Sequence, residues 1–201
     1  LTTENSLRKA LERNEFSLYY QPQINLTSGK IVSFEALIRW NHPDNKIVLP
    51  SEFISIAEEN GLILPIGEWV LQAACTQLKE WQNSLVAGIP VSVNLSSHQF
   101  QQKNFLSTVH TTLLRTGVSP KHIIFEITES TIMQNSDTVL STLHELSALG
   151  VRFSIDDFGT GYSSLSYLKR FPLFAIKIDR SFVKEINTNP DDAAISKAII
   201  S

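Results

Sequence analysis

The sequence has almost no cysteine, no long apolar run and no excess of positive charge. Its single cysteine, Cys75, excludes a framework of intrachain disulfides. No segment has the pattern of a transmembrane helix or of a cleavable signal sequence. The 17 basic and 20 acidic residues give a formal net charge of -3, which argues against a surface for duplex nucleic acid. We therefore expect a cytoplasmic chain without a membrane span.

Length and composition predict one folding unit over residues 1–201. Hydrophobic residues make up 42% of the chain, enough for a substantial core in a domain of this size. A helical pattern begins at once with Leu7, Ala10 and Leu11, and another is unfinished at Ile199 and Ile200. We therefore expect the sequence to belong to a longer protein with an upstream sensory or regulatory module.

Short strand-like runs alternate with segments of helical spacing along most of the chain. The runs are rich in Val, Ile and Phe and cover residues 16–20, 31–40, 91–95, 123–127, 151–155 and 175–178. The first two share a short connection at 27–30 that reads as a hairpin turn, so the first strand should be antiparallel. The others favour a parallel sheet covered by helices, either a closed (β/α) barrel or an open doubly wound sheet.

Polar side chains recur where these strands end. They are Glu35 and Arg39, Asn94, Glu126 and Glu129, Asp156 and Asp157, and Lys177 and Asp179. A single one would be read as a solvated strand end or a helix cap. Five strands with the same feature favour a shared site, because functional groups of a barrel cluster at the C-terminal ends of its strands.

Such a cluster of carboxylates predicts a bound cation. Two unit charges about 4 Å apart repel by roughly 4 kcal/mol at an effective dielectric near 20. One lysine and one arginine cannot neutralise all the carboxylates. Carboxylate and amide oxygens suit Mg²⁺ or Mn²⁺ better than zinc, which prefers His and Cys.

Other sites are less well supported. The five histidines form no HExxH or closely paired arrangement, and Cys75 lies in a helical stretch where core packing explains it. The segment from Gly159 to Ser164 fails as a dinucleotide fingerprint, because Ser164 replaces the third glycine and Asp156 and Asp157 would repel a pyrophosphate. We predict instead a mobile glycine-containing loop that closes over the metal site.

Seven sequence blocks resemble, in order, those of the EAL-domain phosphodiesterases of bacterial cyclic di-GMP signalling. They are FSLYYQP, EALIRW, LPSEFISIAEENGLI, SVNLS, FEITES, IDDFGTGYSSLSYLKRFP and IKIDRSFV. The resemblance implies an α/β fold, a (β/α)8 TIM-like barrel with an antiparallel first strand, of which this sequence covers about six strands. It also implies hydrolysis of cyclic di-GMP to linear pGpG with two Mg²⁺ or Mn²⁺ ions.

The resemblance assigns ligands to both metals. One metal would be held by Glu35, Asn94, Glu126 and Asp156, and the second by Asp156 and Asp157. Two further catalytic roles are implied: Lys177 would hold and polarise the attacking water, and Glu129 would anchor the loop that begins at Asp157.

The resemblance also implies contacts to the substrate. Arg39 would contact a phosphate and Gln21 the bound nucleotide, and Asp179 fits the motif beside them with a less defined role. A homodimer and an upstream sensory or GGDEF-type domain are the partners expected besides cyclic di-GMP.

Two departures from the family pattern qualify this interpretation. Phe174 stands where the family commonly has Asp, and the sequence ends at Ser201, before two strands that carry a catalytic glutamate and a nucleotide-contacting glutamine. We therefore expect these 201 residues to be an incomplete part of the folded barrel, and we expect activity from the complete domain. Two alternatives stay open: a catalytically inactive cyclic di-GMP receptor, and an unrelated metal-dependent barrel enzyme such as an aldolase or an enolase-like protein.

Overall fold

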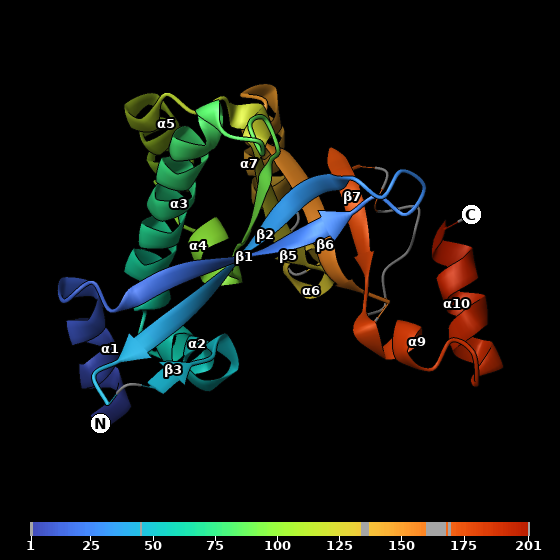
Figure 1. Ribbon diagram of the computed structural model, residues 1–201, viewed down its shortest axis with the longest axis horizontal. Coiled ribbons are helices and arrows are strands. Elements are labelled where there is room, and N and C mark those ends of the chain that lie inside the picture. Colours follow the sequence, from blue (N-terminus) through green and yellow to red (C-terminus); the bar gives the residue numbers. More distant parts are fainter. Residues whose placement is uncertain (1, 45, 134–136, 160–167, 169, 201) are drawn as a thin grey trace. The chain divides into compact units, whose positions relative to one another are not determined.

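A computed structural model describes residues 2–44, 46–133, 137–159, 168 and 170–200 (Figure 1). The chain divides into two compact units, Leu1–Ile124 and Phe125–Ser201. Helices and seven strands make up the described part, which gives an α/β fold. Among the described helices, none combines the length and the apolar character that crossing a bilayer requires.

The first unit contains four strands and most of the longer helices. Its elements are α1 (Thr2–Glu12), β1 (Phe16–Ile24), β2 (Ile31–His42), β3 (Lys46–Val48), α2 (Pro50–Glu59), α3 (Ile63–Glu80), η1 (Trp81–Asn83), β4 (Val91–Asn94), α4 (Ser97–Phe100), α5 (Phe105–Thr116) and η2 (Pro120–His122).

The first two strands form the expected antiparallel hairpin. Phe16 of β1 pairs with Trp40 of β2, and the register runs back toward the turn. In the turn, the side chain of Asn25 accepts hydrogen bonds from the backbone of Thr27 and Ser28, and Gly29 has a φ of +67°. Local hydrogen bonds thus stabilise this polar turn, and Asn and Gly are residues that favour such turns.

Two further pairings extend this hairpin. Strand β4 pairs in parallel with β2, which confirms the expected change from an antiparallel first strand to a parallel series. Strand β3 pairs antiparallel with the end of β2 and was not expected from the sequence. Its three residues are too short for a periodic signal.

An apolar core lies between the hairpin and helices α2 and α3. Trp40 and Phe53 meet edge-on with ring centroids 6.0 Å apart, and Phe16 lies 5.7 Å from Trp69. Cys75 on α3 is fully buried, and burial raises the pKa of its thiol to about 11. The expected packing position of Cys75 is therefore confirmed.

The second unit is built on three strands. Its elements are β5 (Ile123–Thr128), which begins at the unit boundary, α6 (Glu129–Met133), α7 (Asp137–Ala148), β6 (Arg152–Phe158), β7 (Leu173–Ile178), α9 (Arg180–Lys184) and α10 (Pro190–Ile200). Strand β6 neighbours β5 and pairs in parallel with β7. The three strands expected over this part of the sequence are confirmed.

Candidate active site

In the first unit, Glu35 and Asn94 come together from neighbouring strands. Glu35 lies in β2 and pairs with Ser92 of β4, and Asn94 is the last residue of β4. The side-chain amide of Asn94 donates a hydrogen bond of 3.0 Å to the Glu35 carboxylate. Two residues that are 59 positions apart are thus joined by the parallel pairing of their strands.

Gln21 and Arg39 lie on the same face of the hairpin as Glu35. Gln21 pairs directly with Glu35 across the two strands. Arg39 follows Glu35 by four positions on β2, and side chains with an even separation along a strand share a face. The structure therefore brings the two predicted substrate contacts to the face that carries a predicted metal ligand.

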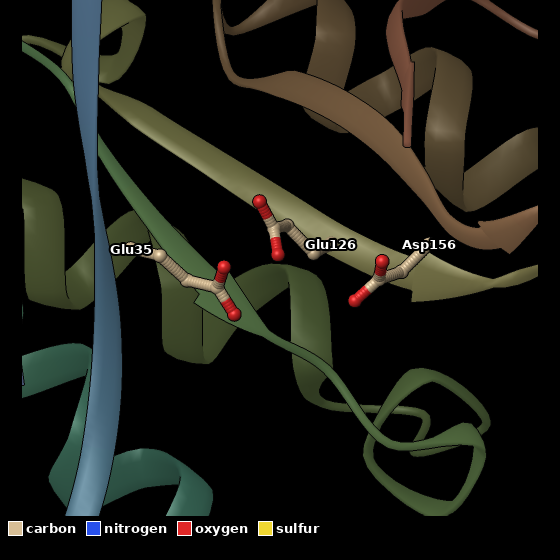
Figure 2. Close-up of side chains that lie close together, drawn as sticks. All are labelled: Glu35, Glu126 and Asp156. Atoms are coloured by element: carbon tan, nitrogen blue, oxygen red, sulfur yellow. The ribbon is translucent and has the colours of Figure 1, made fainter. Parts of the chain in front are cut away.

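In the second unit, the ammonium group of Lys177 lies between two carboxylates. Its Nζ is 2.6 Å from Glu126 Oε2 and 3.1 Å from Asp156 Oδ2. Figure 2 shows these carboxyl groups on β5 and β6, and it also labels Glu35 on β2 of the first unit. Glu126 is only 2% exposed, so its charge needs compensation within the protein. Lys177 supplies part of it.

The next carboxylate, Asp157, has an unusual backbone conformation. Its φ is +52°, and its N–H donates to Asp156 Oδ1 at 3.0 Å. Burial raises the pKa of the Asp157 carboxyl, with further contributions from the negative charges of Asp156 and Asp179. A nearby cation would favour the ionised form of this carboxyl.

Asp179 serves as the N-cap of helix α9. Its carboxylate accepts a hydrogen bond of 2.8 Å from the backbone N–H of Ser181 and another from the Ser181 hydroxyl. These bonds lower the pKa of Asp179. A helix cap thus accounts for this carboxylate, and its contact with substrate stays a prediction.

Glu129 holds the start of the glycine-containing loop. Its carboxylate is 3% exposed and accepts a 2.9 Å hydrogen bond from the backbone N–H of Gly159. Gly159 has a φ of +103°, and a Cβ there would come within 2.8 Å of the Phe182 ring. The remaining predicted loop positions, Gly161 and Ser164, lie outside the described residues.

Two features of the site region were missed by sequence reasoning. Ser96 and Gln99 form a capping box at the start of α4, directly after Asn94, and the S-x-x-Q spacing could have identified it. The ring of Tyr19 lies under the Arg39 guanidinium, with Cζ 5.4 Å from its centroid. Nothing in the sequence marks that contact, because it depends on strand register.

A family model described as the EAL domain matches residues 4–201. The chain belongs to the EAL-domain family. It is 47% identical over 197 residues to the bifunctional diguanylate cyclase/cyclic di-GMP phosphodiesterase MucR of Pseudomonas aeruginosa, covering 98% of this chain and 29% of MucR. It is 38% identical over 201 residues to the cyclic di-GMP phosphodiesterase PdeR of Escherichia coli, covering 100% of this chain and 30% of PdeR.

A solved structure has a closely similar fold. The MucR phosphodiesterase in complex with c-di-GMP has a TM-score of 0.95 and 47% identity, covering 100% of this chain and 81% of that one. The predicted fold class, the TIM-barrel-like α/β fold of EAL domains, is confirmed. The EAL domain described here spans less than a third of the length of the two curated relatives.

Each of the two units, taken by itself, offers oxygen donors of the kind that a hard divalent cation prefers. The first unit supplies the Glu35 carboxylate and the Asn94 amide, and the second supplies the carboxylates of Glu126 and Asp156. Oxygen donors of this kind suit Mg²⁺ and Mn²⁺. The ammonium group already held by Glu126 and Asp156 indicates that these carboxylates favour a positive charge.

Proposed function

We propose that this EAL domain hydrolyses one 3′,5′-phosphodiester of cyclic di-GMP in a divalent-metal-dependent reaction that yields linear pGpG. The observation that best supports this proposal is the ion-pair group of Lys177, Glu126 and Asp156. In it, one buried and one half-buried carboxylate on adjacent strands bind the lysine ammonium group. Relatives that align with nearly the whole chain are named cyclic di-GMP phosphodiesterases, which supports this substrate.

The proposed metal ligands are those that the resemblance to the family implies. Glu35, Asn94, Glu126 and Asp156 would hold one cation, and Asp156 and Asp157 would reach a second. Glu35, Glu126 and Asp156 each offer a carboxylate oxygen as a ligand atom. The chemistry that Mg²⁺ or Mn²⁺ supplies in such a site is activation of a water and stabilisation of charge on the phosphate oxygens.

The chain's own side chains would bind and orient the reactants. The guanidinium of Arg39 would bind a phosphate oxygen, and Gln21, on the same strand face, would contact the nucleotide. Lys177, fixed by two carboxylates, would hold the attacking water through Nζ. Glu129 would keep the segment after Asp157 in place through its bond to Gly159.

At the level of the whole protein, we propose a cytoplasmic location, a homodimer and an additional sensory or GGDEF-type domain. The relative MucR is named as a bifunctional diguanylate cyclase/cyclic di-GMP phosphodiesterase, which supports the additional domain. Size-exclusion chromatography with light scattering on the full-length protein tests the dimer.

The decisive experiment is to incubate the protein with cyclic di-GMP and Mg²⁺ or Mn²⁺ and to separate pGpG by chromatography. We expect product with either ion, none in excess chelator, and little with Ca²⁺, which tolerates looser coordination geometry. Lys177→Ala should lower kcat more than it weakens nucleotide binding, and Lys184→Ala, an exposed lysine of α9, is the control.

Three results would count against this proposal. Turnover in excess chelator would contradict the metal assignment. Poorer binding with unchanged kcat in Lys177→Ala would make that lysine a substrate contact. Tight binding of cyclic di-GMP without pGpG would identify the domain as a receptor.

A further inference from the structure

We propose that Tyr19 is a positioning residue that holds the guanidinium of Arg39 in the orientation needed to bind a substrate phosphate. The observation is the cation–π contact, with Arg39 Cζ 5.4 Å from the centroid of the Tyr19 ring. This lies within the roughly 6 Å over which such contacts are attractive. The inference rests on the proposed function, because Arg39 is a phosphate contact only in that assignment.

Strand register brings the two side chains together. Ser17 of β1 pairs with Arg39 of β2, and Tyr19 pairs with Leu37. Tyr19 and Arg39 are therefore diagonal neighbours on one face of the hairpin, a separation that an aromatic ring and a long side chain can bridge. Gln21 and Glu35 form the next pair on the same face, so the contact lies beside the predicted nucleotide and metal positions.

Arg39 is held at two points. Its Nη1 donates a 2.8 Å hydrogen bond to the backbone carbonyl of the preceding residue, Ile38, and its Cζ lies over the Tyr19 ring. A guanidinium offers five N–H donors in a fixed plane. Fixing that plane leaves the other donors aimed in a defined direction, which lowers the entropy lost when a phosphate binds.

The ring of Tyr19, rather than its hydroxyl, makes this contact. Tyr19 is 49% exposed, and within the described residues its hydroxyl has no hydrogen-bond partner. The hairpin core is formed on the opposite face by residues such as Phe16, Ala36 and Trp40. Phenylalanine should therefore substitute for Tyr19, whereas leucine should keep apolar bulk without the π face.

The test is a double-mutant cycle on affinity for cyclic di-GMP, measured by calorimetry with Ca²⁺ to suppress turnover, and on KM and kcat with Mg²⁺. Tyr19→Leu should raise Kd and KM roughly two- to fivefold, the effect of losing a half-exposed cation–π contact, and change kcat by less than about twofold. Tyr19→Phe should restore the parental values. In an Arg39→Ala background, Tyr19→Leu should have no further effect.

A second cation–π pair provides the matched control. Arg152 lies over the ring of Phe174, at 4.6 Å, in the second unit. Phe174 belongs to none of the predicted catalytic, metal or substrate positions, so Phe174→Leu should leave Kd and KM unchanged. A rise in KM equal to that of Tyr19→Leu would mean that both changes act through general destabilisation, and the proposal would be wrong.

An NMR measurement separates this inference from the proposed function. The Arg39 Nε–Hε resonance should show a ring-current shift that persists in Tyr19→Phe and is lost in Tyr19→Leu. If the parental protein bound no cyclic di-GMP, the proposed function would fail, and this shift would still decide whether Tyr19 positions Arg39. Equal effects of Tyr19→Leu with and without Arg39, or an unchanged Arg39 resonance, would refute the positioning role.

Discussion

Replacing Lys177 by methionine removes the positive charge from the carboxylates of the second unit while keeping much of the side chain's length. In the parental protein, the ammonium group is 2.6 Å from Glu126 and 3.1 Å from Asp156. The side chain of Glu126 is 1% exposed, so water cannot replace the lost contact there. The variant must keep a buried carboxylate with less compensation, or protonate it.

The expected loss of stability follows from this geometry. Breaking a buried ion pair by removing one partner typically costs about 3–5 kcal/mol. We take about 3 kcal/mol, the lower end of that range, because Lys177 is 28% exposed and Asp156 is 22% exposed, which lets water compensate in part. For a chain of this size, that loss lowers the melting temperature by about 6–12 °C.

Thermal unfolding followed by circular dichroism at pH 7, with chelator or with Mg²⁺, is the assay. Lys184→Met is the matched control, since Lys184 is an exposed lysine of the same unit and surface changes stay within about 0.5 kcal/mol. A bound cation can replace the lost ammonium charge, so Mg²⁺ should raise the melting temperature of Lys177→Met more than that of the parental protein.

Two outcomes would refute this reasoning. If Lys177→Met were as stable as Lys184→Met in chelator, the carboxylates would not depend on the lysine for charge compensation. If Mg²⁺ stabilised Lys177→Met no more than the parental protein, the carboxylates of Glu126 and Asp156 would not favour a divalent cation.

Three further substitutions test the site and its supports. Glu35→Ala should abolish pGpG formation at an unchanged melting temperature, because a half-buried ligand is lost without a cavity in the core; turnover at the parental rate would contradict this. Gly67→Ala places a Cβ 1.7 Å from the Gln99 amide, so the free energy of unfolding measured in urea should fall by about 1–3 kcal/mol. Adding Gln99→Ala should restore part of this stability, and purely additive losses of the two substitutions would contradict the clash. Gly159→Ala combines a φ of +103° with a Cβ 2.8 Å from the Phe182 ring, so the free energy of unfolding in the same assay should fall by about 2–4 kcal/mol. Parental stability of this variant would exclude strain at residue 159.

The fold was predictable wherever local signals agreed with tertiary structure. Strands rich in branched residues were found near their observed positions, and the hairpin was found because its turn residues close it locally. Strand β3 was not predictable, since its pairing with β2 depends on a partner strand and not on its own three residues. The division into two units after residue 124 was also not predictable, because the composition does not change at that point.

The sequence predicted which polar residues lie at the ends of strands. It did not predict which atoms each of these side chains contacts. The pairing of Glu35 with Asn94 and of Lys177 with Glu126 depends on strand order and on rotamers. Asp179 illustrates the limit: the same position at a strand end suits a ligand and a helix cap, and only the 2.8 Å bond to Ser181 identifies the cap.

The backbone around Asp156 and Asp157 explains how two adjacent carboxylates could serve one site. In a regular strand, successive side chains point to opposite faces, so neighbouring aspartates would be separated by the sheet. Here the register of β6 with β7 shifts between Ile155 and Phe158, and Asp157 takes a left-handed φ of +52°. A bulge of this kind re-aims a side chain, and aspartate tolerates the left-handed region better than most residues. The strain at Asp157 is therefore localised where the proposed second cation would need its carboxylate.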